Sequence, residues 1–405
     1  MFRPRIITGL DVGTSTVKVL VAQRKAGETE LEVLEENQQK ASGIRKGVVV
    51  NVEEVAGIIS SCIKKSEESL GRRINDVYAS LGGSHIFFIP SHGLVSVSRA
   101  DQKISPEDIE RVIQAAKIFS LPQNKEILEV FPKEFIIDGE KGIKEPLGMR
   151  GVRVEAEVFV LGGFSPYLKN LTRAILNSDL QINDLTLTSL ASSRAVLTPR
   201  EKELGVVLLD IGAGTTSLAV FEEGDLIHTA VFPIGSANIT NDIAIGLRTD
   251  IDTAETIKLE FGSCLLQKST KKEKIKGDLL SEPLVFSQKT LVNIIEARVS
   301  EIFDQVNKEM KKISRQGLLP AGVVLTGGGA KLSKITDLAK KELKLPCRIG
   351  LPRGFSPPQE NPSFSVVCGL VLMGNDLESE REGGGFSFGK GTGTRIKRIF
   401  KIFIP

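Results

Sequence analysis

The sequence predicts an α/β protein with two related halves and a smaller α/β unit inserted into the first half. A motif of the form Asp-x-Gly-x-x-Thr lies between two apolar runs at residues 11–16 and recurs at residues 210–215. Each copy is typical of two strands joined by a tight turn that carries glycine. Because a whole supersecondary unit is repeated, we expect one copy per half. Residues 83–163 have a separate pattern of strands around one helix, which indicates the insertion.

Composition narrows the possible classes of protein. The chain has 405 residues, of which 41% are hydrophobic and 25% charged, as in folded proteins of several domains. A net charge of +3 does not favour nucleic acid as a partner. Four cysteines scattered singly are typical of reduced thiols in a cytosol. The first residues lack the apolar stretch of a signal peptide, and no run approaches the roughly 20 apolar residues of a membrane span. We therefore expect any membrane contact to be peripheral.

Helices and strands alternate through the first half and the insertion. Residues 52–71 have apolar positions at helical spacing and end at a glycine, and residues 76–83 read as a strand. In the insertion, Ser105 followed by Pro106 is a strong helix start. Strands are expected on both sides of that helix. The alternative to a separate subdomain is a long elaboration at the edge of the first half.

The remaining elements lead into and through the second half. Residues 185–204 are expected to form a helix that joins the halves, and the charged run at 267–277 is expected to be a solvated loop. The polar, glycine-rich residues 375–391 predict a flexible linker. Further helices are expected within 164–180, 253–262 and 290–314, and a strand, glycine turn and helix within 323–343.

The two Asp-x-Gly turns are candidate phosphate sites. Glycine lets backbone amides approach an anion closely, and a run of such amides suits phosphate. Asp11 and Asp210 are placed to hold Mg²⁺ through water, because Mg²⁺ keeps several waters and needs few carboxylates. One such turn alone is weak support, since Asp-x-Gly hairpins are common, but two copies indicate phosphates held between paired lobes. The expected phosphate-binding residues are Asp11, Gly13, Thr14, Ser15, Lys18, Asp210, Gly212, Gly214, Thr215 and Thr216.

Two further features are candidates for binding the nucleoside. Three glycines between a strand and a helix permit a flat ring or a ribose to approach the backbone, although a plain helix-start turn has the same pattern. Glu255 and Lys258 lie one helical turn apart. They could hold ribose hydroxyls or form a surface ion pair, and the spacing does not decide between these roles. The glycine motif consists of Gly327, Gly328, Gly329 and Ala330.

The C-terminal residues have an amphipathic pattern. Helical geometry gathers the apolar side chains on one face and the cations on the other. This is typical of a helix that lies on an anionic membrane surface, and the alternative is a helix that docks on a protein. Each cation contributes ~1 kcal/mol and each buried Ile or Phe up to ~1.5–3 kcal/mol, while ordering costs ~1–2 kcal/mol per residue. One copy is therefore a marginal anchor, and polymerisation would strengthen it. The expected membrane-facing residues are Arg395, Ile396, Lys397, Arg398, Ile399, Phe400, Lys401 and Phe403, with Ile404 on the apolar face.

These motifs resemble those of the actin/Hsp70/sugar-kinase superfamily and, within it, the bacterial cell-division proteins of the FtsA family. The resemblance covers nearly the whole chain and includes SHGLVSVSRADQKISPEDIERVIQAAK, VFPKEFIIDGEKGIKEPLGMRGVRVEAEV and AETIKLEFG. It implies an actin-like two-lobed ATPase fold with mixed five-stranded sheets, binding of ATP and Mg²⁺, and polymerisation. It also implies tethering of FtsZ filaments, together with other division proteins, to the cytoplasmic side of the inner membrane at the division site.

The resemblance further implies a division into subdomains and a partner site. The FtsZ C-terminal peptide is expected to contact Glu296 and Arg298, although Glu-Ala-Arg stands here in place of the family's Glu-Pro-Arg. The implied ranges are 1–82 with 164–198 for subdomain 1A, 83–163 for 1C, 199–232 with 318–374 for 2A, 233–317 for 2B, 375–391 for the linker and 392–405 for the membrane helix.

One departure from the superfamily bears on ATP hydrolysis. Members that hydrolyse ATP well usually place Gln, Glu or Asp near the start of the helix before the second Asp-turn, where Thr188 and Ser189 are expected here. Neither hydroxyl is an effective base at neutral pH. We therefore expect at most slow hydrolysis. Two alternatives remain open: a pilus-assembly-type ATPase scaffold, and a sugar or acetate kinase, which would need a carboxylate base and has no use for the C-terminal helix.

Overall fold

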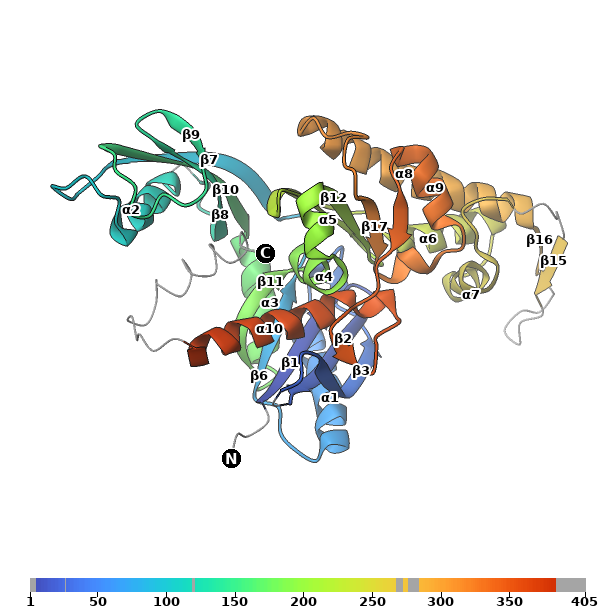
Figure 1. Ribbon diagram of the computed structural model, residues 1–405. Helices are drawn as coiled ribbons and strands as arrows, with labels where there is room; N and C mark the ends of the chain where they lie inside the picture. Colours follow the sequence, from blue (N-terminus) through green and yellow to red (C-terminus); the bar gives the residue numbers. More distant parts are fainter. Residues whose placement is uncertain (1–4, 26, 119–120, 267–271, 276–283, 384–405) are drawn as a thin grey trace.

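Two sheets of matching topology form the centre of the structure (Figure 1). The computed structural model describes residues 5–25, 27–118, 121–266, 272–275 and 284–383. In each half, three strands are antiparallel and two further strands join the sheet in parallel. The five-stranded arrangement is confirmed, and the first sheet has an additional two-residue strand, β19, at its edge.

The first sheet has the strand order β11-β6-β1-β2-β3-β19. Its strands are β1 (Arg5–Val12), β2 (Thr16–Arg24), β3 (Leu31–Lys40), β6 (Asp76–Leu81), β11 (Gln181–Leu187) and β19 (Phe355–Ser356). The second sheet has the order β14-β13-β12-β17-β18. Its strands are β12 (Val206–Ile211), β13 (Thr216–Glu222), β14 (Asp225–Phe232), β17 (Gly322–Thr326) and β18 (Cys347–Ile349).

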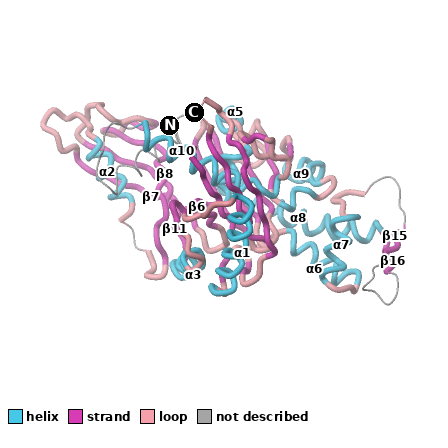
Figure 2. The backbone as a smooth tube through the Cα atoms, turned by 90° about the horizontal axis from the view of Figure 1, so that it is seen from below, coloured by secondary structure: helices cyan, strands magenta, loops and turns pink. Residues whose placement is uncertain are grey.

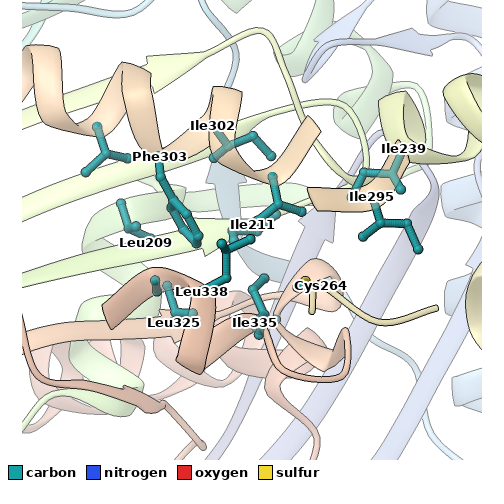
Figure 3. Packing of buried hydrophobic residues seen from close by; sticks show 14 of the residues in the cluster. Leu209, Ile211, Ile239, Cys264, Ile295, Ile302, Phe303, Leu325, Ile335 and Leu338 are labelled. Atoms are coloured by element: carbon teal, nitrogen blue, oxygen red, sulfur yellow. The ribbon is translucent and has the colours of Figure 1, made fainter. Parts of the chain in front are cut away.

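Helices cover both sheets. The buried faces of α1 and α3 pack on one side of the first sheet, while α4 and α10 occupy the layer between the two sheets. Four helices pack with the second sheet around a core that includes Phe303 and Leu338 (Figure 3). The helices are α1 (Val52–Leu70), α3 (Ser165–Leu176), α4 (Thr188–Val196), α5 (Pro199–Leu204), α6 (Ser236–Leu247), α7 (Ile251–Phe261), α8 (Gln288–Lys312), α9 (Ile335–Leu343) and α10 (Ser365–Gly383).

The insertion forms a sheet of its own with the order β7-β10-β8-β9. One helix packs on that sheet and closes a separate apolar core. The expected helix start is present: Ser105 and Asp108 form a capping box, with proline in the first turn. The insertion and the region of α6 to α8 lie at opposite ends of the molecule in both views (Figure 1, Figure 2). Its elements are β7 (Phe87–Ser96), α2 (Pro106–Ala116), β8 (Lys125–Ile137), β9 (Glu140–Ile143) and β10 (Arg153–Phe164).

Helix α10 connects the two halves. At its start, the Ser365 and Thr326 hydroxyl oxygens are 2.5 Å apart, which ties α10 to the second sheet. It crosses α4 so closely that a Cβ at Gly369 would overlap the carbonyl oxygen of Ala191. Near its end, the Tyr78 hydroxyl donates a hydrogen bond of 3.0 Å to Glu378. The helix therefore begins on the second half and ends on the first.

Three expectations about local structure need correction. The linker expected from residue 375 begins later, because α10 continues to Gly383 and Glu378 also pairs with Arg5 at 2.5 Å. Residues 384–391 of the expected linker lie outside the described residues. The helix expected at 185–204 is the end of β11 followed by α4 and α5, because Thr198 caps a new helix. Within the charged run, β15 (Lys272–Ile275) pairs with β16 (Leu284–Ser287), so this part is a strand.

Among the described residues, no helix is both long and apolar enough to cross a bilayer.

Candidate functional site

The two Asp-x-Gly turns have the same backbone geometry. The Gly13 amide donates to the Thr16 carbonyl at 3.1 Å, and the Gly212 amide donates to the Thr215 carbonyl at 2.9 Å. A Cβ at Gly13 would lie 2.9 Å from that Thr16 oxygen, so the turn needs glycine. Each turn thus joins two antiparallel strands in the same way, one in each half.

The fold brings these turns into direct contact. A Cβ on Gly214 would lie 2.7 Å from the Thr14 hydroxyl oxygen. The backbone of the second turn at Gly214 therefore packs directly on the Thr14 side chain of the first turn. Thr14, Gly214 and Thr215 are each partly exposed, and Ser15 is exposed. In contrast, the Thr216 hydroxyl is buried and donates to the Ile234 carbonyl at 2.9 Å. We conclude that Thr216 supports the turn, while the other hydroxyls remain accessible to a ligand.

Two buried aspartates stand at the base of the turns. Asp11 accepts a hydrogen bond of 2.8 Å from Ser80, and its other oxygen lies 3.5 Å from the Lys18 ammonium. Burial, followed by the Asp11 carboxylate, raises the pKa of Asp210 to about 7, against the opposing effects of Lys18 and Ser192. A cation bound beside the carboxylates would favour their charged forms and so oppose both effects.

The pair of carboxylates suits Mg²⁺ held through water. Mg²⁺ binds one or two carboxylates and keeps several of its waters, whereas a site that strips its shell needs more protein ligands. Among the described residues, no group of three or more His, Cys, Asp or Glu side chains could hold a metal. Asp11 and Asp210 supply two buried carboxylates, the number that Mg²⁺ commonly uses when it keeps its waters.

The glycine motif lies directly beside the second turn. Gly327 has a φ of +83°, and a Cβ there would overlap Asp210, so this position requires glycine for two reasons. Gly329 packs on Ile211, while a Cβ on Gly328 would meet nothing within 4 Å. The expected helix does not follow at once: the glycines enter the 3₁₀ turn η1 (Gly328–Lys331), and α9 begins only at Ile335. The other short 3₁₀ turn, η2 (Pro362–Phe364), accepts a 3.0 Å bond from the Gly327 amide.

Glu255 and Lys258 form a partly buried ion pair on the wall of this region. The Lys258 ammonium lies 2.6 Å from Glu255 and donates to the Thr240 hydroxyl at 2.8 Å. It also reaches the Ser236 carbonyl at 3.4 Å, and the Ser236 amide donates to the Gly212 carbonyl at 2.8 Å. The Lys258 side chain is buried, while Glu255 is 41% exposed. The sequence spacing was compatible with either a surface ion pair or a binding-site pair. The contacts of Lys258 with Ser236 and Thr240 connect the pair to the second turn.

Three contributors to this region were missed at the level of sequence. Ser80 is the penultimate residue of β6, beside β1, and donates a hydrogen bond to Asp11, while Ser192 contributes to the environment of Asp210. A two-residue hairpin, formed by β4 (Ile44–Arg45) and β5 (Val48–Val49), contacts the first turn through the Gly47 amide. The two glycines in GIRKG were a usable signal for that hairpin.

Thr188 and Ser189 are the first residues of α4, at the position expected for a catalytic base in the superfamily. The Thr188 hydroxyl is 3.1 Å from that of Ser217, and the Ser189 hydroxyl is 3.0 Å from that of Thr229. Both side chains are therefore held by neighbouring hydroxyls of the second sheet. Hydroxyls in such pairs have no strong base beside them that would activate water.

Glu296 and Arg298 lie on α8, away from the turns. The guanidinium of Arg298 pairs with both oxygens of Asp242 on α6, at 2.5 and 2.9 Å, and also pairs with Glu301. Glu296 pairs with Lys341 on α9 at 3.2 Å. Both sequence-predicted contacts therefore already have partners within the chain. The expected membrane residues, from Arg395 onward, lie outside the described residues.

The comparisons with known proteins agree with this arrangement. The family model described as "Cell division protein FtsA" matches residues 207–369, and the model "SHS2 domain inserted in FTSA" matches residues 83–161. The cell division protein FtsA of Pseudomonas aeruginosa is 37% identical over 381 residues, covering 93% of this chain and 91% of that protein. That of Borreliella burgdorferi is 36% identical and covers 98% of this chain and 96% of its own length.

Solved structures share the fold at lower sequence identity. A chain of the PilM-PilN type IV pilus biogenesis complex has a TM-score of 0.66 and 18% identity, covering 91% of this chain and 98% of that chain. MreB5 of Spiroplasma citri bound to ADP has a TM-score of 0.58 and 14% identity, covering 94% and 99%. These likenesses establish the actin-like ATPase fold.

Proposed function

Because the chain belongs to the FtsA family of cell division proteins, we propose that it binds ATP, polymerises, and tethers FtsZ filaments to the cytoplasmic face of the cell membrane at the division site. The observation that carries the proposal is the meeting of two phosphate-type turns, one from each half, at Thr14 and Gly214. A ligand bound at a site formed by both halves can change the angle between them, as in hinge closure around ligands.

ATP with Mg²⁺ is the ligand that fits this cleft best. Partly exposed hydroxyls and glycine amides of both turns suit the phosphates, and Asp11 with Asp210 suits a hydrated Mg²⁺. The glycine motif at 327–330 would receive the adenosine, with Lys258 and Glu255 beside its ribose. Bound Mg²⁺ would offset the charge of the phosphates. Calorimetry with Mg·ATP is the direct test, and absence of binding heat at several temperatures would refute this part.

Hydrolysis of the bound ATP should be slow. Thr188 and Ser189 offer only hydroxyls held by other hydroxyls at the position where a base would orient water. ATP would then act mainly as a ligand for folding and assembly. A steady phosphate release near the ~10 s⁻¹ of a typical enzyme would contradict this view.

The surface around Arg298 is our candidate site for the C-terminal peptide of FtsZ. A guanidinium binds carboxylates with two parallel hydrogen bonds, and Arg298 already holds Asp242 in this manner. Ile245, one helical turn from Asp242, is 77% exposed and could contact apolar residues of the peptide. A peptide carboxylate would have to displace Asp242, so the Arg298–Asp242 pair lowers the affinity for the peptide.

Membrane attachment is assigned to residues 395–404, whose pattern suits an anionic lipid surface. Sedimentation of FtsZ with anionic vesicles tests the whole proposal, using the full chain and a chain that ends at Gly391. We expect FtsZ in the vesicle pellet only with the full chain and ATP, because avidity requires assembled copies. Equal pelleting with the shortened chain would contradict the tethering function.

The alternative functions have less support. The likeness to PilM, at 18% identity, concerns the fold alone, whereas the relatives at 37% and 36% identity are cell division proteins. No nucleic acid is proposed as a partner, since the net charge is only +3.

A further inference from the structure

The tip of the hairpin formed by β4 and β5 contacts the first phosphate turn. The Gly47 amide donates a hydrogen bond of 2.9 Å to the Thr14 hydroxyl. A Cβ on Gly47 would lie 2.9 Å from the amide nitrogen of Gly83, in the segment that follows β6. The tip is therefore fixed between the turn and the first sheet.

Lys46 occupies the tip in a left-handed backbone conformation. Its φ is +50° and that of Gly47 is +74°, the combination found in type I′ turns, where Asn-Gly is the favoured pair. Lys334 and Lys344 also have a positive φ, so the backbone conformation alone does not distinguish Lys46. The side chain is exposed, and in the described part of the chain its ammonium has no hydrogen-bond or ion-pair partner. An exposed cation without a partner, held beside a phosphate turn by the contacts of Gly47, suggests a role for its charge.

The cleft with bound nucleotide would contain more negative than positive charge. Asp11 and Asp210 contribute carboxylates, and Lys18 lies close to Asp11. Mg·ATP has a net negative charge of its own. The single positive charge of Lys18 does not neutralise the combined negative charge of the two carboxylates and Mg·ATP. Another cation near the phosphates would therefore strengthen binding.

The order of contacts shows which phosphate the tip would meet. Gly327 lies against Asp210, Gly214 of the same turn lies against Thr14, and Thr14 is bonded to Gly47. A nucleotide whose adenosine lies at the glycine motif would extend its phosphates along this series. The hairpin tip stands at its far end, where the terminal phosphate would lie.

We propose that Lys46 is a phosphate-binding residue whose ammonium contacts the terminal phosphate of ATP and so distinguishes ATP from ADP. This inference rests on the proposed nucleotide binding. Charge-assisted hydrogen bonds to phosphate are the stronger class, and loss of one at an exposed site corresponds to about a tenfold change in affinity. ADP lacks the terminal phosphate, so its affinity should depend little on Lys46.

The test measures dissociation constants of Mg·ATP and Mg·ADP for the full chain and three variants. Lys46→Asn keeps a residue suited to the left-handed turn and removes the charge, Lys46→Arg keeps the charge, and Arg45→Gln removes the neighbouring exposed cation as a control. We expect Lys46→Asn to weaken ATP binding about tenfold and ADP binding less than twofold, with the other variants near the parent.

Two results would overturn the inference. Equal ATP affinity in Lys46→Asn and the parent would remove Lys46 from the site, and an equal loss for ATP and ADP would show a general effect on the turn. Thermal unfolding of each variant identifies any loss of structure. If the parent chain binds neither nucleotide, the proposed nucleotide function itself fails, and this inference fails with it.

Discussion

Asp210 should release a proton when Mg·ATP binds at mildly acidic pH. Burial and the neighbouring Asp11 carboxylate raise its pKa from 3.8 to about 7 in the free protein. A nearby Mg²⁺ favours the charged carboxylate and lowers that pKa. A group with a pKa of about 7 is ~0.9 protonated at pH 6 and ~0.1 protonated at pH 8. Binding at pH 6 should therefore release up to ~0.9 proton from this side chain, and binding at pH 8 almost none.

The same shift has a consequence for stability in the absence of nucleotide. A carboxyl whose pKa is higher in the folded than in the unfolded chain binds its proton more tightly when folded. The rise from 3.8 to about 7 therefore makes the free energy of unfolding fall as pH increases through this window. The loss attributable to Asp210 is about 4 kcal/mol, because each unit of pKa corresponds to ~1.4 kcal/mol. It is complete above pH ~7.

Asp210→Asn isolates the effect, since asparagine has the same shape and no titrating carboxyl. Calorimetry of Mg·ATP binding in buffers of different ionisation enthalpy counts the protons released at pH 6 and pH 8. The parent should release more protons at pH 6 than the variant, and the two should agree at pH 8. In urea unfolding, the parent should lose stability from pH 5 to pH 7 relative to the variant. Identical proton counts and parallel stability curves would refute the electrostatic reasoning.

Three other predictions concern the cleft, the peptide site and the membrane end. Gly214→Ala should separate the turns and weaken Mg·ATP binding by roughly 1–3 kcal/mol, whereas Gly57→Ala, with open space around its Cβ, should leave affinity unchanged; equal affinities in calorimetry would contradict this. Asp242→Asn should release Arg298 and tighten binding of the FtsZ peptide severalfold in fluorescence polarisation, and unchanged affinity would exclude competition by Asp242. Phe400→Glu should abolish vesicle binding at any salt concentration, and sedimentation like that of the parent would indicate a protein-docking helix instead.

The parts of the site that could be predicted from sequence are local. Each Asp-x-Gly turn lies between adjacent antiparallel strands, so a short stretch of sequence determines it. The contact between Thr14 and Gly214 joins residues two hundred positions apart, and only the fold reveals it. Lys258 is a similar case, because its burial depends on Thr240 of another helix. The two glycines of residues 43–47 indicate a hairpin, but the sequence does not show that this hairpin contacts Thr14.

The extent of α10 could not be read from composition. Polar and acidic residues after position 375 are typical of a linker, and glycine follows soon after. Glu378 and Asp376 instead find partners in Arg5, Tyr78 and Arg194, which come from the first half. Such long-range ion pairs and hydrogen bonds stabilise helical turns that local propensity leaves marginal. The boundary of a helix therefore depended on residues far away in sequence.

The path of α10 also determines what a distance probe on this protein would report. The last described turns of α10 are fastened to the first sheet through Tyr78 and Arg5, while its beginning is bonded to Thr326 of the second sheet. The end of α10 thus shares the frame of reference of the first half, even if the halves rotate. A spin label or dye near its C-terminal end should keep a constant distance to β1, whereas its distance to α9 would change with the opening angle. One label near the end of α10 would then measure the opening angle through its distance to α9, with its distance to β1 as the internal control.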